Sequence, residues 1–137
     1  MSQRQQIVDA LTTLLNTTSG LENKVTCWRL QPFQPGDLPA AIFSDRDAEA
    51  EELVGGYYAH RLPVNIQVVA SGTSAAVSVR SLAEAVLTTI NTDPTLAGLL
   101  DAIILTGVEL DGDLQATEIF SANIQLTLEY QTDSLTF

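Results

Sequence analysis

Two segments of the chain carry apolar residues at the spacing of an amphipathic helix. The first, Gln3–Leu15, has its apolar stripe at Ile7, Leu11, Leu14 and Leu15. The second, Ala75–Asn91, has its stripe at Val79, Leu82, Val86 and Ile90, widened by Ala83 and Leu87. A stripe of this kind buries one face of a helix against a core. We therefore expect two main helices, the first capped by Ser2 and the second by Thr73 or Ser74.

Two long segments alternate apolar and polar residues, as a strand does when one face of its sheet is buried. They are Tyr57–Ala70 and Thr117–Gln131. In the second segment the expected buried side chains are Phe120, Ala122, Ile124, Leu126, Leu128 and Tyr130. Pro63 donates no ladder hydrogen bond, so the first segment should lie at a sheet edge or contain a bulge.

Three shorter segments complete the expected strands: Val25–Leu30, Ala40–Ser44 and Ala102–Leu110. A proline-rich turn separates the first two, and Asp111-Gly112 is a hairpin signal that should join the third to the last long strand. This order predicts an α+β fold, with two main helices packed on one face of a mostly antiparallel sheet of four to five strands. The length of 137 residues fits a single domain covering residues 1–137.

Acidic side chains dominate the charge of the chain. Seventeen Asp and Glu residues against six Lys and Arg residues give a net charge of −11. Binding to a phosphate backbone requires clustered cations, so we expect no sequence-specific nucleic-acid binding. The longest apolar runs are far shorter than the roughly 18 residues that span a bilayer. We therefore expect no membrane partner, and the polar start of the chain is not that of a signal peptide.

Five of the acids lie in one short run that we treat as a candidate interface: Asp45, Asp47, Glu49, Glu51 and Glu52. Gly55 and Gly56 follow the run, which we interpret as the exposed connection of a β-hairpin. A solvated loop is the simpler interpretation. Binding of a basic partner surface or of a hard cation is the alternative.

The sequence shows no pattern that indicates catalysis, a cofactor or a metal. One histidine and one cysteine cannot form a usual zinc site, and no phosphate-binding glycine motif occurs. His60 lies at the inward phase of its strand, where a structural hydrogen bond is the expected role, and Cys27 is expected to be a small core residue. The carboxylates of Asp111 and Asp113 lack the spacing of a calcium loop. We therefore expect a protein that is not an enzyme.

The two long expected strands exceed the usual five or six residues. A domain of this size cannot bury such strands completely, and an open strand edge pairs readily with another chain. The strand pattern therefore predicts assembly with copies of the same chain or with other proteins.

The order of several short motifs resembles that of the tail-terminator (tail-completion) proteins of long-tailed phages, the family of minor tail protein U. The motifs are RQQIVDALTTLL, VTCWR, DLPAAIFSD, HRLPVNIQVVA, DPTLAGL and LEYQT. They extend over nearly the whole chain, from Gln3 to Asp133. Each motif is a loose pattern, so the resemblance depends on their order and spacing.

The resemblance implies a structural virion protein with no catalytic residues and no cofactor. Its expected form is a ring, typically a hexamer, at the head-proximal end of the tail tube of a phage or prophage particle. There it ends tube polymerisation and joins the tail to the head. The implied partners are other copies of the chain, the tail tube protein and the head-tail connector protein. The implied location is the virion tail, after assembly in the host cytoplasm.

Two other interpretations stay open. One is another phage tail or neck component, such as a tube subunit, which would polymerise without limit where a terminator closes into a ring. The other is a small-molecule-binding or enzymatic α+β domain, which would require a concave pocket with convergent polar groups.

Overall fold

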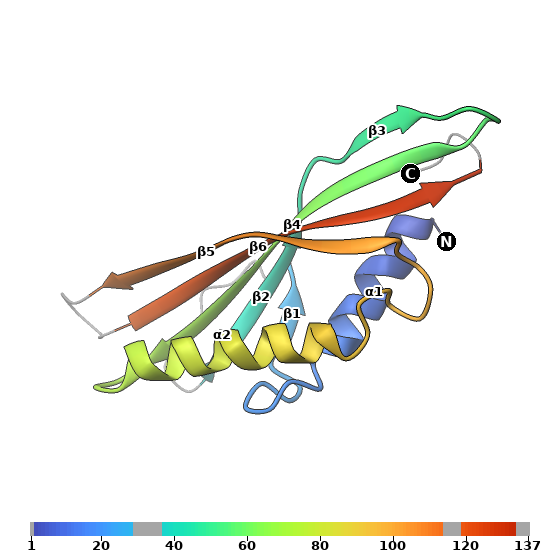
Figure 1. The fold of residues 1–137 in the computed structure, drawn as a ribbon. Helices are drawn as coiled ribbons and strands as arrows, with labels where there is room; N and C mark the ends of the chain where they lie inside the picture. The colour runs from blue at the N-terminus through green and yellow to red at the C-terminus, as the bar shows by residue number, and fades with distance from the viewer. Residues whose placement is uncertain (1, 29–36, 114–118, 134–137) are drawn as a thin grey trace.

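The computed structural model describes residues 2–28, 37–113 and 119–133, which form two helices and a six-stranded sheet (Figure 1). The helices, α1 (Gln3–Leu15) and α2 (Ala75–Asn91), have the predicted boundaries and lie on the same face of the sheet. The side chain of Ser2 accepts a hydrogen bond from the backbone N–H of Gln5 (3.1 Å) and so caps α1, as predicted. The N-cap residue of α2 is Ser74, which makes no side-chain capping bond.

The sheet is antiparallel except for one short pair. Its strands are β1 (Val25–Cys27), β2 (Ala40–Asp45), β3 (Glu49–Glu52), β4 (Tyr58–Ser71), β5 (Ala102–Asp113) and β6 (Ile119–Thr132). Their spatial order is β1-β2-β4-β6-β5, with β3 beside the first part of β4. Only β1 and β2 run parallel among the described strands. The predicted α+β class is therefore confirmed, but the sheet has six strands where four to five were expected, and the additional strand is β3.

The core lies between the two helices and one face of β2, β4 and β6. On β4 and β6 every second side chain is buried: Leu62, Val64, Ile66, Val68, Ala122, Ile124, Leu126, Leu128 and Tyr130. Directly paired residues of antiparallel strands share a face, and the register joins these side chains pair by pair. The apolar stripes of α1 and α2 pack on them. The alternation predicted for β6 is confirmed from Ala122 to Tyr130, whereas Phe120 is only partly buried.

The prediction that Pro63 marks a sheet edge or a bulge is wrong, because β4 lies inside the sheet between β2 and β6 and pairs with β6 through Pro63 without a register shift. Pro63 is tolerated for a local reason. Its carbonyl accepts a hydrogen bond from the N–H of Arg46 (2.8 Å), so its nitrogen also faces the β2 side. On that side the pairing with β2 ends at Val64 and the pairing with β3 begins at Arg61. The N–H group that Pro63 lacks would therefore point to the gap between β2 and β3, where neither strand pairs with β4.

The predicted hairpin turn at Asp111-Gly112 is also wrong. Both residues belong to β5 and pair with Ser121 and Phe120 of β6. The strand simply continues past the local turn signal, since pairing along the whole of β6 outweighs a two-residue preference. The connection between β5 and β6, including the predicted strand start at Thr117, lies outside the described residues. The same holds for the end of the predicted strand Val25–Leu30 and for Pro32 and Pro35, which follow it.

The acidic run is only in part a loop. Glu49–Glu52 form β3, which pairs with the first residues of β4 from Glu49↔Arg61 to Glu52↔Tyr58. The sequence suggested a loop because the run is strongly charged and is followed by Gly55 and Gly56. In the structure the backbone of Glu49–Glu52 instead pairs with β4.

Candidate functional site

The edge strand β5, which pairs with β6, has a half-exposed apolar face. Its side chains on the core side lie directly opposite buried residues of β6: Ile103 opposite Leu128, Leu105 opposite Leu126, Val108 opposite Ile124 and Leu110 opposite Ala122. Leu105 is 50% exposed, Val108 44% and Leu110 52%, and we call these three residues the open strip. The core face of the sheet thus continues one strand beyond the part that the helices bury.

A β-bulge keeps the open strip on one face. The register shifts between Leu105 and Gly107, so that Thr106 is the extra residue, and its hydroxyl donates to the carbonyl of Gln125 (3.0 Å). Without this insertion Val108 and Leu110 would point to the opposite face from Leu105, because side chains alternate along a strand. The bulge therefore gathers apolar surface that a regular strand would divide between two faces.

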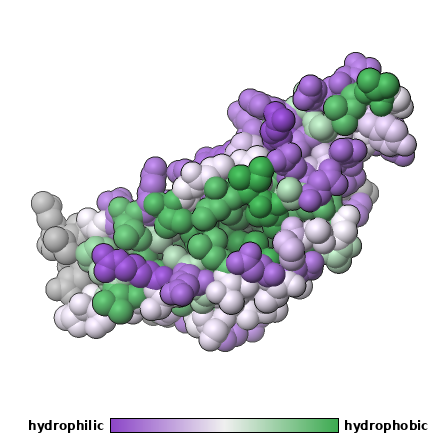
Figure 2. All heavy atoms as spheres, viewed as in Figure 1, coloured by the Kyte–Doolittle hydropathy of each residue, from purple (hydrophilic) through white to green (hydrophobic). Residues whose placement is uncertain are grey.

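At Leu110 the open strip lines a groove whose other wall is α2, and Figure 2 shows apolar surface between β5 and this helix. Near the start of α2 the groove deepens into a notch of about 80 Å³. Its lining comprises Ala76, Val79, Arg80, Leu110, Asp111, Gly112 and Phe120. A Cβ atom at Gly112 would lie 2.5 Å from the ring of Phe120, so glycine is needed to leave room for that ring. The notch is smaller than a ligand pocket of roughly 300 Å³ or more, and its size suits a single side chain.

At the other end of the sheet a hairpin projects beyond the helices (Figure 1). This arm consists of β3, the turn 53–57 and the paired ends of β4 and β6. The N–H of Leu53 donates to the carbonyl of Tyr57 (2.7 Å), and Gly55 and Gly56 have φ of 93° and 83°, which favour glycine. The tip exposes apolar side chains, since Val54 is 100% exposed and Tyr57 49%.

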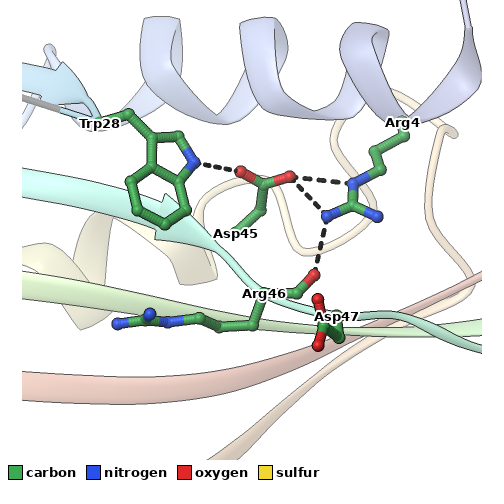
Figure 3. A pocket seen from close by; sticks show the side chains of 5 residues that line it. All are labelled: Arg4, Trp28, Asp45, Arg46 and Asp47. Atoms are coloured by element: carbon green, nitrogen blue, oxygen red, sulfur yellow. Dashed lines mark hydrogen bonds and ion pairs between the residues drawn. The ribbon is translucent and has the colours of Figure 1, made fainter.

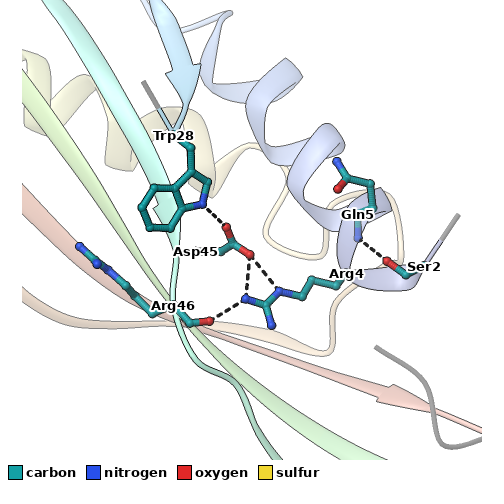
Figure 4. Close-up of polar contacts among 6 residues, drawn as sticks. All are labelled: Ser2, Arg4, Gln5, Trp28, Asp45 and Arg46. Atoms are coloured by element: carbon teal, nitrogen blue, oxygen red, sulfur yellow. Dashed lines mark hydrogen bonds and ion pairs between the residues drawn. The ribbon is translucent and has the colours of Figure 1, made fainter. Parts of the chain in front are cut away.

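A polar network ties the base of the arm to α1 (Figure 4). Arg4 of α1 holds Asp45 through two nitrogens, at 2.9 Å from Nε and 2.8 Å from the terminal nitrogen. The same guanidinium donates to the carbonyl of Arg46 (2.7 Å), and the indole N–H of Trp28 donates to Asp45 (2.6 Å). The network therefore fixes the point where β2 ends and the chain turns into the arm.

The carboxyl of Asp45 is kept ionised by this network. Burial by itself would raise its pKa, but the hydrogen bonds from Trp28 and Arg4 and the charge of Arg4 hold the pKa below its ordinary value. Asp45 shares the core-side face with Val64, which turns it toward α1. It is thus a structural anion.

His60 stabilises the arm from inside. It is buried, its Nε2 lies 2.9 Å from the hydroxyl of Thr132, and its ring stacks on Tyr130 with centroids 4.7 Å apart. Burial lowers the pKa of the imidazole and raises that of the Tyr130 hydroxyl. The structural hydrogen bond expected for His60 is confirmed.

The structure divides the five candidate acids among different surroundings. Asp45 is paired with Arg4 near α1, and Asp47 lines an open hollow beside it. Glu49 and Glu51 lie on the same face as Arg61, whereas Glu52 lies on the opposite face, across from Tyr58. Four of the five are exposed, but they do not form one surface.

The hollow at the arm base has a volume of about 520 Å³ (Figure 3). It is lined by Arg4, Trp28, Asp45, Arg46 and Asp47, and the guanidinium of Arg46 lies 5.7 Å from the centre of the Trp28 ring. The polar groups of Arg4 and Asp45 already bond to each other, so the hollow offers a ligand chiefly the exposed side chains of Arg46 and Asp47.

The described part of the chain shows little that indicates metal or membrane binding. Among these residues there is no group of three or more His, Cys, Asp and Glu side chains that could hold a metal ion. Nor does any described helix have the length and hydropathy needed to cross a bilayer. Cys27 is partly buried against the core, as predicted, and burial raises the pKa of its thiol.

The fold and these surfaces define an α+β protein with an open apolar edge and a projecting arm. No protein-family model matches the chain, and no curated protein matches it. Among solved structures the chain is similar to one from the virion of a native gene transfer agent particle, with 10% sequence identity and a TM-score of 0.47. The similarity covers 96% of this chain and 92% of the other. At this identity and TM-score the likeness carries no argument about function.

The open strip and the arm tip were not identified from the sequence. A signal for the strip existed, since its apolar residues recur at intervals of two on either side of Thr106-Gly107, with one residue inserted there. For the tip, the adjacent glycines marked a turn, but exposure of Val54 and Tyr57 follows only from how far the arm projects.

Proposed function

We propose that this chain is a structural protein of a phage-type particle, acting as a tail-terminator subunit rather than as an enzyme. In this role copies form a ring, typically a hexamer, on the head-proximal end of a tail tube. The ring stops tube growth and offers a surface to the head connector. The ordered motifs from Gln3 to Asp133 support this role. The α+β fold agrees with the one that the resemblance implies.

The observation that carries the proposal is the half-exposed apolar face of β5. A long, apolar strand at a sheet edge is a site for association with another chain, and natural proteins cover or blunt such edges. Here the strip of Leu105, Val108 and Leu110 lies on the same face as the core. Such a surface favours a protein that works within an assembly.

The acidity of the chain fits a component through which DNA passes. A net charge of −11 repels a phosphate backbone, so a ring of such subunits would bind the passing duplex weakly. The exposed glutamates of β3 contribute to this charge.

Electron microscopy of the protein mixed with phage tail tubes tests the proposal. We expect density at one end of each tube and tubes that no longer elongate when tube protein is added. Bare tube ends, with unchanged elongation, would contradict it. A protein that coats the tube along its length would do the same.

A tube subunit is the nearest competing role, and the mass of the assemblies distinguishes the two. A terminator should form closed particles of one size, whereas a tube subunit should form filaments whose length grows with concentration. Analytical ultracentrifugation over a concentration series measures this difference.

A ligand-binding role is favoured by one observation, the hollow at the arm base. Its volume of about 520 Å³ falls within the range of small-molecule pockets. Such pockets are mostly apolar, however, and Trp28 is the single aromatic residue of this lining. If the hollow binds a ligand, Trp28→Ala should remove that binding and leave tube capping unchanged.

A further inference from the structure

We propose that the arm tip of one copy of this chain docks into the groove between α2 and β5 of the next copy. The inference deepens the proposed function, because it names the contact through which subunits would join. It requires only that copies of the chain meet.

The exposed apolar residues favour this pairing of surfaces. Among the described residues the large exposed apolar side chains are Trp28, Val54, Tyr57, Val77, Ile104, Leu105, Val108 and Leu110. They form two main groups, the open strip with its groove and the arm tip with Val54 and Tyr57. The first group is concave at the notch, and the second projects into solvent. A concave apolar site and a projecting apolar tip are complementary in shape.

The tip cannot reach the groove of its own chain. The arm tip adjoins the pair Tyr58↔Thr132, and the notch lies beside the other end of the same ladder, at Ser71↔Ile119. Thirteen strand residues at about 3.3 Å each separate the two ends by roughly 43 Å. The contact must therefore join two copies, and because it joins different surfaces it is head-to-tail. Repetition of a head-to-tail contact produces a ring when the rotation closes.

Charge favours the same orientation. The arm carries Glu51 and Glu52 just before its tip, and the cation lining the notch is Arg80 of α2. Asp111 lines the β5 side of the notch, so an acidic arm should approach from the α2 side. Pairing of β5 with β5 of another copy is disfavoured, because it would bring Glu109 and Asp111 of both copies onto one shared edge.

Disulfide trapping tests the contact directly. In a Cys27→Ser background, a Val54→Cys chain is mixed with a Leu110→Cys chain that carries a mass tag, under mild oxidation. We expect a mixed disulfide dimer, formed at least about tenfold faster than with a Val77→Cys chain in place of Leu110→Cys. Val77 is the matched control, since it is an exposed valine of α2 (64%) that does not line the notch. Equal rates for the two mixtures would overturn the inference.

Mixing two blocked variants tests the head-to-tail arrangement. Val54→Asp should disable the tip and leave the groove intact, and Leu110→Asp should disable the groove and leave the tip intact. Each variant alone should self-associate at least about tenfold more weakly than the wild type. A mixture should form pairs that do not grow further, because each pair has one functional tip and one functional groove in contact. A mixture that behaves like either variant alone would contradict the head-to-tail contact.

The results separate this inference from the proposed function. If the disulfide forms but the assemblies are open filaments that do not cap tubes, the contact stands and the terminator role fails. If tubes are capped by rings in which Val54→Cys and Leu110→Cys do not cross-link above the control, the role stands and the contact fails. If the wild-type chain stays monomeric and the Val54→Cys and Leu110→Cys chains give no cross-link above the control, the contact is overturned.

Discussion

Leu126 and Leu105 are paired neighbours on adjacent strands, but the first is buried and the second is half exposed. They are directly paired, on β6 and β5, and so point to the same face of the sheet. Leu126 is 2% exposed, whereas Leu105 is 50% exposed. The residue type, the face and the strand pairing are the same. The difference is that α2 packs over β4 and β6, while the strand at the edge lies beyond it.

This comparison shows that an apolar strand face can serve folding or assembly, depending on what covers it. Burial of a leucine stabilises a fold by roughly 1.5–3 kcal/mol relative to leaving it exposed. The half-exposed leucine retains part of that free energy, which becomes available when another chain covers it. The two strands thus divide one continuous apolar face between the core and a docking surface.

The largest expected effect comes from shortening the two leucines in turn. Leu126→Ala should lower the free energy of unfolding by about 2–5 kcal/mol, because it leaves a cavity in a packed core. Leu105→Ala should lower it by less than about 1 kcal/mol, because much of the side chain is already in water. Urea unfolding of both variants measures the difference. Similar losses for the two would show that β5 is covered within the monomer.

The next effect concerns the network at the arm base. Asp45→Asn should lower the free energy of unfolding by about 1–3 kcal/mol at pH 7, because Arg4 loses its charged partner. The folded-state pKa of Asp45 is depressed, so this stabilisation is full above the unfolded pKa, about 3.9, and is lost as pH falls through the folded pKa. The wild type and the variant should therefore converge in acid. A difference that stays constant down to the lowest pH would contradict this account.

A smaller effect is expected from His60. Burial depresses its folded-state pKa, so the stabilisation is complete above the unfolded pKa, about 6.5, and is lost as pH falls toward the folded pKa. The chain has one histidine, so the pH slope of unfolding between about 5.5 and 8 should largely disappear in His60→Gln. The slope of the wild type is limited to about 1.4 kcal/mol per pH unit for one proton. An unchanged slope in the variant would rule out His60 as its source.

The smallest effect on folding is expected from the exposed acids of the arm. Replacing Glu49, Glu51 and Glu52 together by Ser should change the free energy of unfolding by no more than about 0.5 kcal/mol, because all three are exposed. Self-association and tube capping should weaken if these acids face a neighbouring subunit or the tube. Unchanged ring formation and capping would remove the arm acids from the interface.

The elements with a strong local signal were predictable from the sequence. Both helices begin and end where their apolar stripes do, and β6 buries the alternating side chains from Ala122 to Tyr130 that its pattern indicates. Periodicity reports which face of an element is apolar, and neighbouring residues are enough to define it. His60 was likewise assigned to a structural role from its phase in the strand, and its bond to Thr132 agrees.

Long-range placement decided the rest. The sequence did not separate the buried Leu126 from the half-exposed Leu105, nor Asp45, which bonds to Arg4 forty-one residues away, from the exposed glutamates that follow it. It also suggested an edge or a bulge for Pro63, because no local rule says that Pro63 will lie between the end of the pairing with β2 and the start of the pairing with β3. The hydrophobic pattern of a sequence indicates whether each side chain favours the core or the solvent. Which apolar surfaces remain exposed depends on which strands α2 covers and on where the pairing with β2 ends and the pairing with β3 begins. Only the packed tertiary structure sets those positions.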